Sequence, residues 1–210
     1  MKIKWVKYLV LIVVAGLLAY NSVYFKKLNG KKATLQTNLD PAQFARSFWK
    51  DKFANYLDSA VDINSFLKLL KDDPNGAFTK YAKTQGIGNT SCFLLKAEGQ
   101  IIEVKEDEIM VKINSDVAET KVKLNTGLYF GNAIRDVTGL IKMGDFGNTI
   151  DYNSVSSELN KIVQAEVISP LKTKVKKGDT VSFIGCTEIN KEQINIDNIE
   201  LLPVKISLNK

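Results

Sequence analysis

An uninterrupted apolar stretch near the N-terminus constrains this chain more than any other feature. Residues 8–25 contain no charged side chain, and lysines flank them on both sides. As an α-helix, this stretch would extend about 27 Å, close to the thickness of the hydrocarbon core of a bilayer. Tyr8, Tyr20 and Tyr24 lie near its ends, where amphipathic rings favour the membrane–water interface. We therefore expect an uncleaved, single-pass membrane anchor.

The sequence also leaves other interpretations of this apolar stretch to consider. A cleaved signal peptide has the same basic start and apolar centre, but the triplet Ala19-Tyr20-Asn21 is a poor cleavage site. A lipoprotein signal needs a cysteine just after the apolar stretch, and the first cysteine is Cys92. Lysines on both sides leave the orientation undecided by charge. The short N-terminal tail and the long C-terminal part favour a domain outside the cytoplasm.

The positive charge of the chain belongs mainly to the flanks of this stretch. Seven of the 29 basic residues fall within residues 1–32, which leaves 22 against 23 acidic residues in the remainder. Because that remainder lacks a positive field, we expect no nucleic-acid partner. The chain has no histidine, which excludes histidine-based triads and histidine-ligated zinc, and two cysteines cannot fill a four-cysteine site. We expect no metal, no cofactor, and a binding or scaffolding module rather than an enzyme.

We expect residues 1–32 to comprise a cytoplasmic tail, the anchor and its basic flank, and residues 33–39 to form a polar stalk. The part of the chain that follows, residues 40–88, has a pattern typical of helices. Asp40-Pro41 suits a helix start, because aspartate caps helices and proline fits the first turn. Apolar and aromatic side chains then recur at helical spacing as far as Tyr81. We expect residues 40–88 to form a small helical subdomain, with the aromatic stripe as the packing face of a hairpin.

The spacing changes to that of strands from about residue 89. Apolar side chains alternate over residues 91–104, 109–113 and 117–129, and again over 179–188 and 194–208. Between the two groups, residues 151–172 have helical spacing. Three strands, a helical insertion and two strands follow the order of an OB-type barrel. We expect an α+β fold in which residues 89–210 form a five-stranded antiparallel barrel with a helical connector between strands three and four; a five-stranded meander sandwich is the alternative.

Several segments of this chain are similar to those of one known family. The most specific segment is residues 131–160, GNAIRDVTGLIKMGDFGNTIDYNSVSSELN. Shorter similar pieces are Asp40-Pro41 with Phe48-Trp49, the apolar helix at 66–70, Tyr81, and residues 98–102, 180–185 and 203–204. In these segments the chain resembles DUF2291, a family of uncharacterised predicted periplasmic lipoproteins. The resemblance implies an extracytoplasmic location and an association with sugar ABC-transport components, hence envelope or sugar-transport proteins as partners. The chain departs from the family because it lacks the lipobox cysteine, so a peptide anchor at residues 8–25 would replace the lipid.

Six residues of the specific segment make the best candidate site. They are Arg135, Asp136, Asp145, Phe146, Asn148 and Tyr152. A guanidinium, carboxylates and an aromatic ring together suit a small carbohydrate ligand. The alternative is structural: Arg135 pairs with a nearby acid and fastens the connector to the barrel. In either case we expect Arg135, Asp136, Asp145 and Asn148 to converge on one location.

The remaining functional alternatives also depend on polar pairs. Asp136 and Asp145 could form the carboxylate pair of a glycan hydrolase, but 23 acidic residues offer many such pairs. Cys92 and Cys186 fall in the first and fourth strands, where they could form a disulfide outside the cytoplasm or remain buried thiols. A membrane-anchored envelope module that binds a ligand and serves sugar uptake is our main hypothesis. A purely structural scaffold of an envelope complex is the second.

Overall fold

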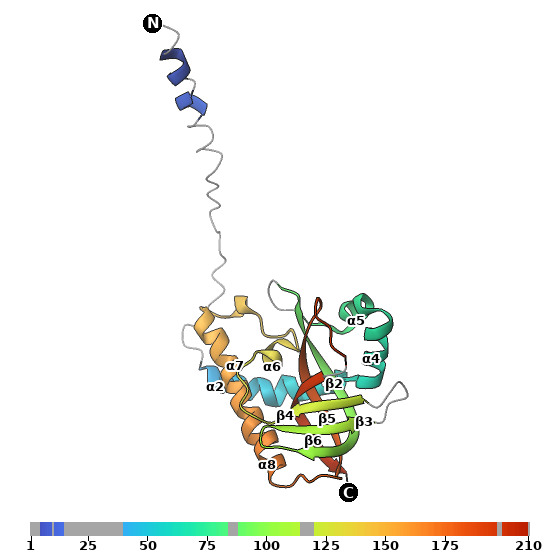
Figure 1. Cartoon of the computed structure of the whole chain (residues 1–210). Coiled ribbons are helices and arrows are strands. Elements are labelled where there is room, and N and C mark those ends of the chain that lie inside the picture. Colours follow the sequence, from blue (N-terminus) through green and yellow to red (C-terminus); the bar gives the residue numbers. More distant parts are fainter. Residues whose placement is uncertain are drawn as a thin grey trace. The chain divides into compact units, whose positions relative to one another are not determined.

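The computed structural model describes residues 5–9, 11–14, 40–83, 88–113, 120–196 and 199–209 (Figure 1). Residues Leu35–Lys210 form one compact unit, and Met1–Thr34 form another. Within the described ranges, no helix has both the length and the apolar character needed to cross a bilayer. Most of the expected anchor at residues 8–25, and all of the expected stalk, lie outside those ranges.

The compact unit begins with a continuous helical rod. It comprises α2 (Pro41–Ser47), a π-helical segment (Phe48–Phe53), α3 (Ala54–Tyr56) and a 3-10 turn (Leu57–Ser59). The start is as predicted: the Asp40 side chain accepts a hydrogen bond from the Ala42 amide at 2.9 Å, and Pro41 occupies the first turn. These contacts satisfy a backbone donor that a helix start otherwise leaves without a partner.

Two shorter helices follow and end the predicted helical region. A two-residue strand, β1 (Val61–Asp62), leads into α4 (Ile63–Asp72) and α5 (Pro74–Tyr81). Each helix has an aspartate cap, since Asp62 accepts from the Ser65 amide and Asp73 accepts from the Gly76 amide. The caps set sharp helix starts at the positions where the apolar spacing resumes.

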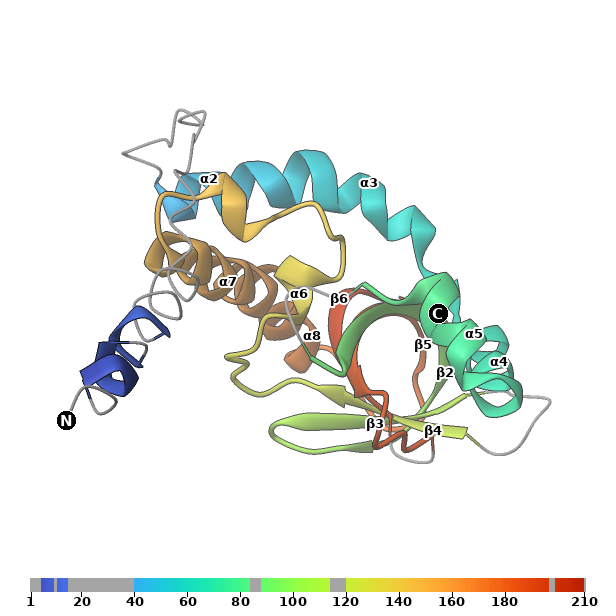
Figure 2. The ribbon, with the colours of Figure 1, turned by 90° about the horizontal axis from the view of Figure 1, so that it is seen from above.

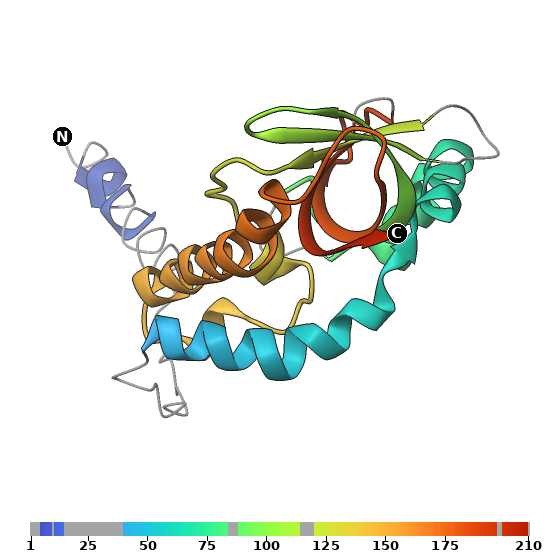
Figure 3. The same cartoon turned by 90° about the horizontal axis from the view of Figure 1, so that it is seen from below.

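The predicted strands form a closed barrel. They are β2 (Thr90–Val104), β3 (Glu108–Ile113), β4 (Thr120–Asn125), β5 (Thr180–Asn190) and β6 (Ile199–Asn209). The barrel order is β2-β3-β4-β6-β5, and β5 pairs with β2 to close the ring, which Figures 2 and 3 show nearly end-on. The short β1 adds to β2 outside the ring. The chain is therefore α+β with a five-stranded barrel, as its sequence predicts.

The prediction that the barrel is wholly antiparallel was wrong at one pair. Strands β4 and β6 run parallel, with Val122 opposite Ile199, whereas the other four pairs of the ring are antiparallel. The reason is the odd number of strands. Directions that alternate around a ring of five cannot alternate at every junction, so at least one neighbouring pair must be parallel.

A largely helical connector of 54 residues, 126–179, joins β4 to β5. It holds α6 (Ala133–Asp136), a 3-10 turn (Met143–Asp145), α7 (Thr149–Val163), a π-helical segment (Gln164–Ile168) and α8 (Ser169–Lys172). The buried side chains of α7 include Val155, Leu159 and Ile162, spaced three or four residues apart. That face packs against the rod that begins with α2.

The helices share two cores with the barrel. One core lies between the rod, the connector and the outer face of the barrel, and includes Phe48, Phe53 and Leu159. The other combines the barrel interior with α4 and α5, and includes Phe66 and Phe93. Figures 2 and 3 show the rod and α4–α5 on different sides of the barrel.

The aromatic stripe of residues 40–81 is therefore a packing face; α4 and α5 contact each other, but the rod packs on α7 and does not form a hairpin with them. The first half of the stripe packs on α7 and its second half on the barrel, so the helices have no separate core of their own. The physical reason is a limited set of apolar side chains on the outer face of the barrel, among them Leu94, Leu202 and Val204, which are buried in one core with the rod and α7.

Candidate functional site

Arg135 and Asp136, the centre of the predicted site, form a buried ion pair on α6. The Arg135 Nε donates to Asp136 Oδ1 at 2.6 Å, and Nη2 donates to Oδ2 at 3.1 Å. Two parallel hydrogen bonds between a guanidinium and a carboxylate are the strongest geometry for such a pair. Both residues are buried, with exposed fractions of 4% and 9%.

The network continues from this pair to α7. The Arg135 guanidinium stacks 3.7 Å from the centre of the Tyr152 ring, and Nη1 donates to the Tyr152 carbonyl and to Asn153 Oδ1. The Tyr152 hydroxyl is 3.4 Å from Asp136 Oδ1. The donors and acceptors of the pair are thus directed at protein groups rather than at solvent. This arrangement supports a structural role, in which the pair fastens α6 to α7.

The predicted convergence of Asp145 and Asn148 with this pair was wrong. Both are exposed, and each belongs to its own turn. Asp145 Oδ2 accepts from the Lys142 amide, and Asn148 caps α7 by accepting from the Asp151 amide at 2.8 Å. Local hydrogen bonds of this kind are what short polar side chains form at helix starts. Asp136 is buried and bonded to Arg135, whereas Asp145 is exposed and bonded within its own turn, so the two carboxylates lie in different surroundings.

Phe146, in contrast, joins the buried network. Its ring packs edge-on against Phe44 of α2 at 5.5 Å and against Tyr152 at 5.4 Å. Of the six predicted residues, four come together: Arg135, Asp136, Phe146 and Tyr152. A ligand role for them stays a prediction.

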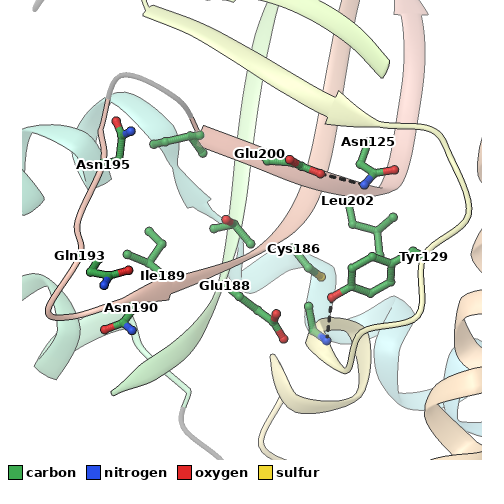
Figure 4. Close-up of a pocket in the computed structure, with 13 residues that line it drawn as sticks. Asn125, Tyr129, Cys186, Glu188, Ile189, Asn190, Gln193, Asn195, Glu200 and Leu202 are labelled. Carbon is green, nitrogen blue, oxygen red and sulfur yellow. Dashed lines mark hydrogen bonds between the residues drawn. The ribbon is translucent and has the colours of Figure 1, made fainter. Parts of the chain in front are cut away.

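A polar pocket lies next to this network, at one end of the barrel (Figure 4). Its volume is about 310 Å³, within the range of small-molecule sites. The connector after β4, the end of β5, the loop that follows β5 and the start of β6 all contribute to it. The amides that line it are those of Asn125, Asn190, Gln193 and Asn195. Tyr129, Glu188 and Glu200 add a phenol and two carboxylates, and Ile199 and Leu202 are among its apolar lining.

Several side chains of the pocket are held in place. Asn125 donates to Glu200 at 2.8 Å, and Lys123 forms an ion pair with the same carboxylate. The Tyr129 hydroxyl accepts from the Ala133 amide at 3.4 Å, so its own proton remains available to a ligand. Side chains that hydrogen bonds or ion pairs already hold in place lose little conformational entropy when a ligand binds, and this favours affinity.

The Glu188 carboxyl has an unusual electrostatic environment within the pocket. Although Glu188 is exposed as a residue, partial burial of its carboxyl raises its pKa above the ordinary value; Asp136 raises the pKa further by repulsion, and Arg135 opposes that effect. Burial of the ring, and then the charge of Glu188, raise the pKa of Tyr129, which therefore stays protonated. Tyr129 is thus a hydrogen-bond donor at neutral pH, and Glu188 is an acceptor when ionised.

The two cysteines lie beside this pocket as buried free thiols. In the register of β2 and β5, Cys92 is opposite Glu188 and Cys186 is opposite Leu94, so the cysteines are diagonal neighbours. Diagonal positions on adjacent strands are about 7–8 Å apart, beyond the usual span of a disulfide. Burial raises the pKa of Cys92 to about 12, which keeps its thiol protonated and unreactive.

Apart from Cys186, which was predicted only as a possible disulfide partner, the sequence predictions did not include the residues of this pocket. Tyr129 and Glu188 stand at the ends of two expected strands, and neither position looks unusual on its own. The one available signal was the amide-rich composition of residues 189–198, INKEQINIDN, between the last two strands. A loop rich in asparagine and glutamine at the mouth of a barrel offers many hydrogen-bonding groups.

Known proteins resemble this chain in both sequence and fold. The model of the DUF2291 family, described as predicted periplasmic lipoprotein, matches residues 13–207. The crystal structure of an OB-fold protein from Thermotoga maritima matches with a TM-score of 0.72 and 30% sequence identity, and covers 82% of this chain and 99% of that one. No curated protein matches. These findings confirm the OB-type barrel and support an extracytoplasmic, membrane-associated protein. The chain belongs to the DUF2291 family of predicted periplasmic lipoproteins.

Proposed function

We propose that this protein is a membrane-tethered binding module of the cell envelope, which holds a small hydroxyl-bearing molecule in the pocket beside Tyr129. The observation that supports this proposal is the composition of the pocket. Its amides and phenol supply both donors and acceptors, and its apolar lining can contact the face of a sugar ring. No lysine or arginine is among the described residues that line it, so phosphorylated or carboxylated ligands are disfavoured. A role beside sugar-transport proteins would fit such a ligand.

Calorimetric titration of the Leu35–Lys210 unit with sugars tests the proposal, since this unit contains both cores of the fold. We expect uncharged monosaccharides or polyols to bind and their phosphorylated counterparts not to bind. Tyr129→Phe removes the hydroxyl donor but keeps the ring, and should weaken binding by roughly twofold to tenfold, the usual value of one hydrogen bond.

The matched control is Tyr81→Phe, which makes the same change on α5, away from the pocket, and should leave the affinity unchanged. If neither an uncharged nor an amine-bearing sugar produces heat or a thermal shift, the binding proposal fails. The scaffold function then takes its place. Its own support is the exposure of Leu128 and Phe130, at 76% and 87%, which offers apolar contacts to a protein partner.

We also propose that residues 8–25 tether the module by a peptide anchor, because no cysteine precedes Cys92 to carry a lipid. The full chain should then stay with the membrane pellet after a carbonate wash, with its N-terminus intact on sequencing. A soluble product that begins near residue 22 would instead identify the stretch as a cleaved signal peptide.

A further inference from the structure

The two carboxylates of the pocket differ in how their charges are balanced. Glu200 is paired with Lys123 and also accepts from Asn125. Glu188 forms no ion pair with any residue that the structure describes, and its side-chain partner there is the Cys92 thiol, with Sγ 4.0 Å from Oε1. The nearest guanidinium, that of Arg135, is committed to Asp136 by two hydrogen bonds. Of the two carboxylates in the pocket lining, Glu188 is therefore the one without an ion-pair partner among the described residues, and its exposed side chain is accessible to a ligand from solvent.

The surroundings of Glu188 suit a cation. Asp136 adds to the negative potential and Arg135 offsets part of that effect, while no basic side chain of the described residues lines the pocket. Figure 4 shows Glu188 on β5 and Tyr129 on the connector after β4 as parts of the same lining. An ammonium group held between them would gain a charge-assisted hydrogen bond from the carboxylate and attraction from the aromatic ring. A neutral hydroxyl in the same place would gain only an ordinary hydrogen bond.

We propose that the ligand of this pocket carries a protonated amine, which Glu188 binds beside Tyr129, so that the preferred class is an amino sugar rather than a neutral sugar. The inference rests on the proposed function, because it assigns a charge to the ligand of the same pocket. The amides of Asn190, Gln193 and Asn195 would hold the hydroxyl groups of that ligand. Glu188 then acts as the residue that determines specificity.

Glucose and glucosamine make the direct test, since they differ only by a hydroxyl and an amine at one carbon. The test is a titration of the full chain, held in lipid nanodiscs, with each sugar. The pH is kept slightly below neutral so that the amine is protonated. Glucosamine should bind roughly tenfold more tightly than glucose, the difference between a charged and a neutral hydrogen bond. In Glu188→Gln, which keeps the shape of the side chain, the ratio of the two affinities should fall to about one.

The control is Glu192→Gln, which removes the same charge from the β5–β6 loop outside the pocket lining. Its carboxylate accepts from Asn89, and its replacement should leave the ratio of affinities unchanged. Equal binding of glucose and glucosamine by the unmodified chain would overturn the inference and leave the proposed function standing. Binding of neither sugar, nor of any other member of the neutral panel, would remove the proposed function itself. A preference for glucosamine that persists in Glu188→Gln would also overturn the role of Glu188.

Discussion

Replacing Arg135 by alanine should lower the free energy of unfolding by about 3–5 kcal/mol, because it leaves the buried Asp136 carboxylate without its partner. The pair is almost fully enclosed, and its remaining hydrogen bonds reach Tyr152 and Asn153 on α7. Loss of the guanidinium therefore removes both the charge balance and the tie between two elements. For a unit of this size the melting temperature should fall by roughly 6–20 °C. Chemical and thermal unfolding of the Leu35–Lys210 unit measure both quantities.

Asp145→Ala is the control for this change. Asp145 belongs to the same connector but is exposed, and its hydrogen bond among the described residues is to the Lys142 amide of its own turn, so its loss should cost about 1 kcal/mol or less. Arg135→Lys should be nearly as damaging as alanine, because an ammonium cannot reproduce the two-pronged contact with Asp136. A melting temperature of Arg135→Ala within a degree or two of the original would show that the network is not structural.

Phe93→Ala should destabilise the unit by a comparable amount, about 3–5 kcal/mol, through the cavity that it leaves. The ring lies on β2 with an exposed fraction of 1%, and contacts Phe66 at 4.9 Å and Phe78 at 5.1 Å between ring centres. It thereby joins α4 and α5 to the barrel interior. Urea unfolding followed by circular dichroism measures the loss.

Phe130→Ala provides the matched control, since the same change at a ring that is 87% exposed removes little buried area. We expect its free energy of unfolding to stay within about 0.5 kcal/mol of the original. If Phe93→Ala were equally mild, α4 and α5 would have to pack on the barrel through other contacts than this ring.

The sequence predicted those parts of the fold that depend on local patterns. Alternating apolar residues identified the five barrel strands, and Asp40-Pro41 identified the first helix start, because both signals act over a few residues. The parallel pairing of β4 with β6 was missed, since it follows from closure of the whole ring. The aromatic stripe led us to expect a helical hairpin; α4 and α5 do contact each other, but the rod packs on α7, which lies far along the chain.

The contacts of the candidate site were likewise predicted where they are local in sequence and missed where they depend on the whole fold. The Arg135–Asp136 contact joins adjacent residues, so a local argument could anticipate it. Asp145 and Asn148 were grouped with it by sequence distance, but each found a closer partner in the backbone of its own turn. The pocket brings Tyr129 together with Glu188 and Gln193, about sixty residues away, and only the closed barrel makes them neighbours.

The longest ladder of the barrel has a consequence for how the chain acquires its structure. Strand β2 pairs with β5 from Thr90 opposite Asn190 to Gln100 opposite Thr180, so these contacts span eighty to one hundred residues. Such high contact order slows folding, and a chain made or exported N-terminus first presents β2 long before its partner emerges. Until then one edge of β2 has unpaired backbone groups beside the apolar side chains of Phe93 and Leu95. During that interval the half-made barrel is a natural client for a chaperone that shields exposed strand edges.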